Sequence, residues 1–167
     1  AIAAAFNKPT YDIVIRNGKI IDGTGNPAFS GDIGISNGKI EFIGTIEESG
    51  GKEIDAKEQV VCPGFIDVHT HAENVLNFQD AENFTRMGVT TIVVGNCGGS
   101  EENLGKFFKD IEKKKVSVNV ASLFGHNTVR RRVMGGNFNR PPTNGEMSDM
   151  RNLVDQAMRD GAVGLST

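Results

Sequence analysis

Apolar strand-like runs alternate with amphipathic helical segments through residues 62–167, and this alternation restricts the possible folds more than any other feature. The runs VTTIVVG at 89–95 and VSVNVASLFG at 116–125 are rich in the β-branched residues that favour strands. The segment between them, 100–115, has helical spacing, with Ser100 as its expected N-cap. Strands that alternate with helices favour a parallel sheet. We therefore expect an α/β fold, either a doubly wound sheet or the first half of a (β/α)8 barrel.

The other elements of this region complete a β-α-β-α-β-α-β order. An apolar run, VCPGFIDV at 61–68, predicts the first strand, and the spacing of 74–88 predicts a helix after it. A third helix is expected at 147–161, where apolar residues form one stripe, and AVGLS at 162–166 would open a fourth strand. Because the chain stops as this strand begins, we expect it to be part of a longer polypeptide.

Residues 1–61 have a different pattern, which predicts a small β-rich portion. The stretch YDIVIRNGKIID at 11–22 alternates apolar and polar residues, and Asn17-Gly18 is typical of a type I′ hairpin turn. The motif I-x-N-G-K-I recurs with Asn37-Gly38. We therefore expect two antiparallel hairpins, which would need further structure to pack against. The resulting division places the β portion at 1–61 and the incomplete α/β portion at 62–167.

Charge and composition exclude several partners. The net charge is −3 and the two signs are mixed along the chain, which argues against nucleic acid as a partner. The sequence contains no apolar run long enough to span a bilayer, so no membrane partner is expected. With two cysteines, Cys62 and Cys97, the chain is not a disulfide scaffold. We expect a cytoplasmic location, or a periplasmic or secreted one if the N-terminus is a processed end.

All three histidines and one of the two cysteines follow predicted strands at their carboxyl ends. His69 and His71 come after the first strand, Cys97 after the second and His126 after the third. Side chains at i and i+2 of an extended chain leave the same face, so the two neighbouring imidazoles can reach one ion. A thiolate from Cys97 would add a third zinc ligand. The pattern predicts a metal site at the edge of the sheet where parallel strands end.

Each of these residues also has a plainer interpretation. A single buried histidine is more often a hydrogen-bonded core residue, and His126 could be a ligand, a substrate-binding residue or a brace for its loop. Asp67 could orient a ligand or be an ordinary polar residue. In HNTVRRRVMGG at 126–136, Arg130 or Arg131 could bind a substrate carboxylate, although a solvated basic loop is the simpler expectation. Cys62 is expected to be a small buried apolar residue.

Four motifs in order resemble the amidohydrolase superfamily, and specifically its branch of N-acyl-D-amino-acid deacylases, or D-aminoacylases. They are PGFIDVHTH, GVTTIVVGNCGGS, GHNTVRRRVMG and DGAVGLST, and the resemblance extends over nearly the whole chain from Tyr11. It implies a (β/α)8 TIM barrel with a β-sandwich built from both ends of the full chain. It also implies zinc-dependent hydrolysis of the amide bond of an N-acyl-D-amino acid.

The same resemblance assigns roles to residues. It implies that Cys97 binds a tightly held zinc ion and that His69 and His71 form a neighbouring metal position, so that one or two zinc ions are expected. It implies two later histidines and a catalytic aspartate, which would lie beyond Thr167, so no catalytic residue is expected in this chain. A second polypeptide would supply the rest of the barrel. The sequence departs from the family at Ala72, which precedes Glu73 where acidic residues often follow H-x-H directly.

The expected function is therefore zinc-dependent hydrolysis of small N-acyl-D-amino acids, with His126, Arg130 and Arg131 as candidate substrate-binding residues. Hydrolysis of a cyclic amide or a dipeptide is an alternative within the same superfamily. A non-catalytic half-domain is an alternative of another class, favoured by the lack of a catalytic aspartate.

Overall fold

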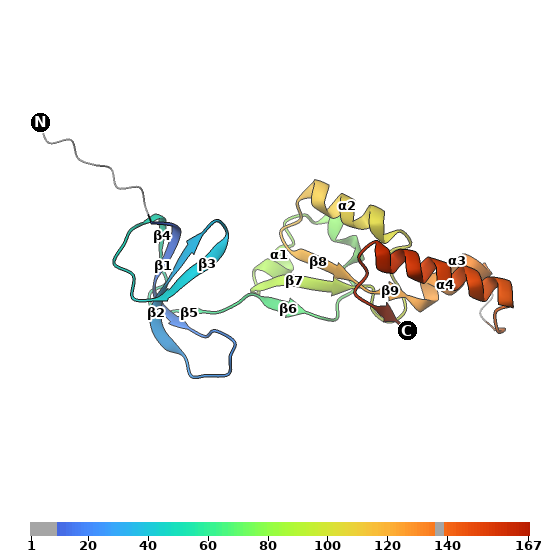
Figure 1. Ribbon diagram of the computed structural model, residues 1–167, viewed down its shortest axis with the longest axis horizontal. Helices are drawn as coiled ribbons and strands as arrows, with labels where there is room; N and C mark the ends of the chain where they lie inside the picture. Colours follow the sequence, from blue (N-terminus) through green and yellow to red (C-terminus); the bar gives the residue numbers. More distant parts are fainter. Residues whose placement is uncertain (1–9, 136–138) are drawn as a thin grey trace, which may run out of the picture. The chain divides into compact units, whose positions relative to one another are not determined.

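The computed structural model describes residues 10–135 and 139–167. The chain divides into two compact units, and the boundary between them along the sequence lies between Pro63 and Gly64. Within the described residues the first unit contains one sheet and the second contains two (Figure 1). None of the helices in the described ranges is long and apolar enough to cross a membrane.

The first unit is a five-stranded mixed sheet. Its strands run in the order β3-β2-β1-β4, and β5 pairs with the end of β1. The pairs of β2 with its neighbours are antiparallel, whereas β4 and β5 both pair with β1 in parallel. The strands are β1 (Tyr11–Ile20), β2 (Phe29–Ser36), β3 (Lys39–Gly44), β4 (Gly50–Asp55) and β5 (Val60–Val61).

The two Asn-Gly pairs have different roles, so the expectation of two hairpins is only half right. Asn37 and Gly38 have φ values of 51° and 72° and join β2 to β3 in a tight turn, as a type I′ hairpin requires. Asn17 and Gly18 instead lie inside β1, where the register with β2 is irregular. The reason is tertiary, because the Asn17 backbone N–H donates to Asp32 and its side chain donates to Asp55.

The second unit is a parallel α/β structure, in agreement with the predicted alternation. Three strands pair in parallel in the order β6-β7-β8, and β9 pairs in parallel with β10. These strands are β6 (Phe65–Asp67), β7 (Val89–Val94), β8 (Asn119–Ser122), β9 (Phe124–Gly125) and β10 (Leu165–Ser166). The helices are η1 (Glu73–Asn77), α1 (Glu82–Thr85), α2 (Leu104–Lys114), α3 (His126–Met134) and α4 (Asn144–Arg159), of which α3 and α4 pack together (Figure 1).

One hydrophobic core connects the strands and helices of this unit. On α2, Leu104 and Phe107 are buried on one stripe because they are three residues apart on the same face. They join the inward-facing residues of β7 and the buried residues of α3 and α4. The main members are Ile92, Val94, Leu104, Phe107, Phe124, Val129 and Met150.

Three local expectations are wrong. The segment 74–88 forms only the short helices η1 and α1, because Ala81 has a left-handed backbone (φ 44°) that interrupts any longer helix. Helix α2 begins at Leu104, where the Asn103 side chain accepts from the Lys106 N–H, so Ser100 is not its N-cap. The stretch expected as a basic loop forms helix α3 as far as Met134.

Helix α4 begins with a capping box that also contains an ion pair. The Thr143 hydroxyl accepts from the Glu146 N–H, while the Glu146 carboxylate accepts from the Thr143 N–H. The two terminal guanidinium nitrogens of Arg140, Nη1 and Nη2, donate to the same carboxylate at 2.7 and 2.6 Å. The Arg140 hydrogen bonds, together with the Thr143 N–H, lower the pKa of Glu146 from 4.5 to about 2.

We predict that Glu146 makes the stability of this unit depend on pH in the acid range. Because the pKa of the carboxyl in the folded chain is below its ordinary value, the ionised form stabilises the fold above pH 4.5, and this stabilisation is lost as the pH falls toward 2. Glu146→Gln should therefore be less stable than the natural chain near pH 6, and the difference should shrink by pH 2. Thermal unfolding followed by circular dichroism measures it, and a difference that does not change with pH would contradict the prediction.

Candidate metal centre

His69, His71 and Cys97 come together at the carboxyl ends of β6 and β7, which are neighbours in the sheet. Their donor atoms all lie within 4.8 Å of one another, and the three side chains are exposed. The His69 Nε2 atom is 3.3 Å from the Cys97 Sγ atom. The two imidazole rings meet edge to face, with their centroids 5.7 Å apart. The expectation that the strand-end pattern places these three residues side by side is met.

Thr70 explains why both histidines face the same way. Its backbone N–H and its hydroxyl both donate to the Val93 carbonyl at the end of β7, at 3.0 and 2.9 Å. This buries Thr70 against the neighbouring strand. Since His69 and His71 flank a residue that is fixed inward, their side chains turn outward together. Asp67 accepts a hydrogen bond from the His69 backbone N–H at 3.2 Å, so it braces the chain.

Cys97 lies at the tip of a turn with unusual backbone angles. Gly95, Cys97 and Gly98 have φ values of 79°, 54° and 75°. For a residue with a side chain this left-handed conformation costs roughly 1–2 kcal/mol. Gly95 is required here because a Cβ atom would lie 2.1 Å from the Leu123 carbonyl oxygen. The chain therefore passes close to the Leu123 backbone, and the Cys97 thiol lies at the edge of the sheet where the parallel strands end.

A set of small polar groups holds this turn. The Asn96 side chain donates to the carbonyls of Val93 and Thr70, at 2.9 and 3.3 Å. Two more side chains bind the backbone of the glycines. Glu73 accepts a hydrogen bond from the Gly95 N–H, and Ser166 accepts one from the Gly98 N–H. Sequence patterns did not indicate these roles, since the partners are up to 71 residues apart and follow no period.

The donor set suits a zinc ion. Two imidazole nitrogens and one sulfur are common zinc ligands, and tetrahedral zinc keeps such atoms roughly 3.3–3.6 Å apart. The His69–Cys97 distance of 3.3 Å already falls in that range. The widest separation, up to 4.8 Å, needs only a small movement of exposed side chains.

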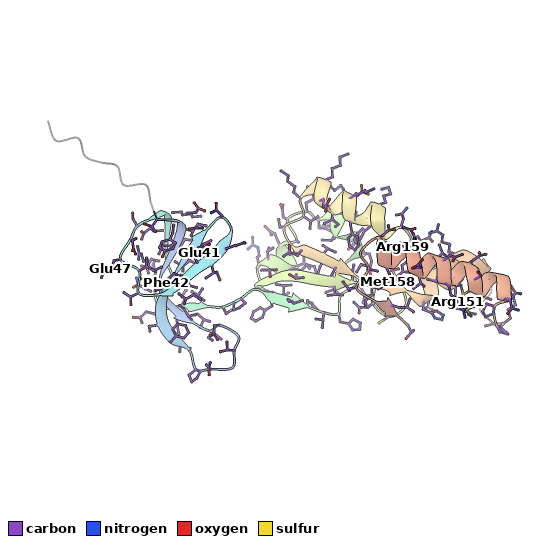
Figure 2. All side chains as sticks on the ribbon, viewed as in Figure 1. Glu41, Phe42, Glu47, Arg151, Met158 and Arg159 are labelled. Atoms are coloured by element: carbon purple, nitrogen blue, oxygen red, sulfur yellow. The ribbon has the colours of Figure 1, made fainter. Side chains whose placement is uncertain are left out.

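His126, Arg130 and Arg131 belong to α3, and His126 is not one of the three clustered donors. His126 is the first residue of α3, and with Arg130 it lines a mostly apolar cavity of about 500 Å³ beside α4. Arg151 and Met158, which are labelled on α4 in Figure 2, also line this cavity. Arg130 also donates to the Arg140 carbonyl at 3.1 Å, whereas Arg131 is exposed. Their role in substrate binding stays a prediction.

The two cysteines differ from expectation in one respect. Both are free thiols. Cys62 is exposed, however, so the expectation that it is a buried apolar residue is wrong. It lies in the extended segment that follows β5, which leaves it outside the sheet.

Comparison with known proteins gives a consistent assignment. Residues 52–167 match the amidohydrolase family. The D-aminoacylase of Alcaligenes xylosoxydans xylosoxydans is 32% identical over 182 residues, which cover 94% of this chain and 37% of that protein. The chain thus spans little more than a third of the length of this relative.

Solved structures agree in fold with the chain. A D-aminoacylase structure that concerns a binuclear metal centre matches with a TM-score of 0.88 and 32% identity, covering 94% of this chain and 38% of the other. The N-acyl-D-glutamate deacylase from Bordetella bronchiseptica matches with a TM-score of 0.87 and 33% identity over the same shares. That enzyme was solved with zinc and a phosphonate inhibitor that mimics the tetrahedral intermediate of the reaction.

We predict that Cys97→Ala strongly weakens metal binding while His126→Ala retains it. Loss of the thiolate should weaken the affinity for cobalt or zinc by at least roughly 100-fold, the upper end of what loss of an outer ligand partner costs. Cobalt titration measures this, because a cobalt–thiolate bond has its own ultraviolet charge-transfer absorption. His126 lies outside the cluster and is the matched control. An unchanged cobalt spectrum in the Cys97 variant would contradict the assignment.

Proposed function

Since the chain belongs to the amidohydrolase family, we propose that it is the metal-binding part of a zinc-dependent hydrolase that cleaves the amide bond of N-acyl-D-amino acids. The likeness to D-aminoacylase and to N-acyl-D-glutamate deacylase supports this substrate class. The observation that carries the proposal is the cluster of His69, His71 and Cys97 at the carboxyl ends of adjacent parallel strands.

The arrangement of strands supports a (β/α)8 barrel as the complete fold. β6, β7 and β8 pair in parallel in chain order, and the β9–β10 pair continues the alternation of strand and helix. Within the described residues β6 has a neighbour on one side only, and Phe65, Ile66 and Val68 around it are exposed. Such apolar surface normally packs against further structure. We propose that residues outside these 167, on this or a second polypeptide, complete the barrel, and that the first unit contributes to a β-sandwich.

The residues of this chain would bind and orient the metal. His69 and His71 would each offer a neutral imidazole nitrogen, and Cys97 a thiolate. When bound, zinc polarises a carbonyl and lowers the pKa of water, which is the chemistry that amide hydrolysis needs at neutral pH. The remaining histidines and the proton-transferring aspartate that the resemblance implies would come from outside these residues.

Exposure of the three donors fits this function. A metal that hydrolyses a substrate must keep a position open to that substrate, whereas a structural zinc is enclosed by four protein ligands. In the described part of the chain three donor groups meet and all three are open to solvent, which leaves room both for the further ligands that the proposal expects and for a substrate. A non-catalytic half-domain would have no need for such a cluster.

A substrate panel tests the proposal. The enzyme that contains this chain should hydrolyse N-acetyl-D-amino acids at least about 100-fold faster than the L-forms, since the wrong stereoisomer places the amide away from the metal. A chelator should abolish the activity and zinc should restore it. Preference for a cyclic amide or a dipeptide would move the enzyme to another branch of the family. Activity that survives removal of all metal would overturn the proposal.

A further inference from the structure

The backbone around Cys97 receives unusual support from two side chains. The Glu73 carboxylate accepts from the Gly95 N–H at 2.9 Å. The Ser166 hydroxyl donates to the Gly95 carbonyl at 2.5 Å and accepts from the Gly98 N–H at 3.0 Å. Both polar groups of Gly95 are therefore satisfied by side chains, and the same Ser166 hydroxyl also binds Gly98, on the other side of Cys97. Neither Glu73 nor Ser166 is among the candidate metal ligands.

We propose that Glu73 and Ser166 are positioning residues, which hold the Cys97 turn in the conformation that brings its thiol to the histidines. The inference rests on the proposed metal site. A left-handed cysteine is unfavourable in isolation, so other contacts must keep it in place. Gly95 and Gly98 are both buried, which makes their backbone hydrogen bonds costly to lose.

Glu73 also connects the segment of His69 and His71 to the turn that carries Cys97. It is two residues after His71 and opens helix η1, so its carboxylate is carried by the same segment as the histidines. Its bond to Gly95 ties that segment directly to the turn of Cys97. Ser166 provides the second tie from β10, a strand that carries none of the three donors.

Variants of Glu73 separate its hydrogen bond from its charge. Glu73→Asp keeps the charge but is one methylene shorter, and it should weaken cobalt affinity about 10- to 100-fold, the usual effect of losing a group that orients a ligand. Glu73→Gln keeps an acceptor of the same length and should stay within about fivefold of the natural chain, since a neutral acceptor bonds somewhat less strongly. Ser166→Ala should weaken affinity by the same 10- to 100-fold. Glu112→Ala, which removes one exposed charge from α2, is the matched control and should change nothing.

The measurements are cobalt affinity and the cobalt–thiolate absorption, with far-ultraviolet circular dichroism to show that each variant is folded. Glu73→Asp and Ser166→Ala should diminish the thiolate band while the helical signal is retained. If both bind cobalt as the natural chain does, the proposal is wrong. It is also wrong if Glu73→Gln binds cobalt weakly while Glu73→Asp binds it as the natural chain does, since charge would then be the cause. If the natural chain itself shows no cobalt–thiolate band, the proposed metal site fails, and that result is distinct from the others.

Discussion

The close approach of the Gly95–Gly98 turn to the neighbouring strands is the constraint on which the rest of the second unit depends. A Cβ atom on Gly95 would meet the Leu123 carbonyl oxygen, and one on Gly125 would lie 2.2 Å from the Gly98 carbonyl oxygen. That Gly98 carbonyl accepts the N–H groups of Asn127 and Thr128, which lie in the first turn of α3. The turn that presents the thiol is thus also the surface on which the next strand and helix are placed.

The polar residues around this turn form hydrogen bonds with one another and with the backbone. Ser100 was expected to cap α2, but its hydroxyl accepts from the Gly125 N–H and its own N–H donates to Thr128. Thr128 is buried and donates back to the Ser100 carbonyl. Among the described residues, every buried side-chain nitrogen or oxygen atom has a hydrogen-bond partner. Such satisfied networks make a site rigid, whereas a partly satisfied one would weaken the core.

The sequence predicts the arrangement of elements and the meeting of the three donors, but it does not predict their supports. The alternation of strands and helices and the cluster of His69, His71 and Cys97 follow from general properties of parallel sheets, in which strand ends share one edge. The course of β1 through Asn17-Gly18 does not follow, because contacts with Asp32 and Asp55 override the local turn preference. The short helices in 74–88 are missed for a related reason, since the left-handed Ala81 is not visible in a pattern of apolar spacing.

The bond between Ser166 and the Cys97 turn has a consequence for the order of folding. All three donors are present in the chain by residue 97, but the hydroxyl that binds Gly95 and Gly98 belongs to β10, 71 residues after Gly95. A contact of this separation forms late, after the entropy of closing a long loop has been overcome. The donor cluster therefore reaches its final geometry only when β10 packs against the Cys97 turn. A metal ion that prefers this geometry would stabilise that final step more than any earlier one.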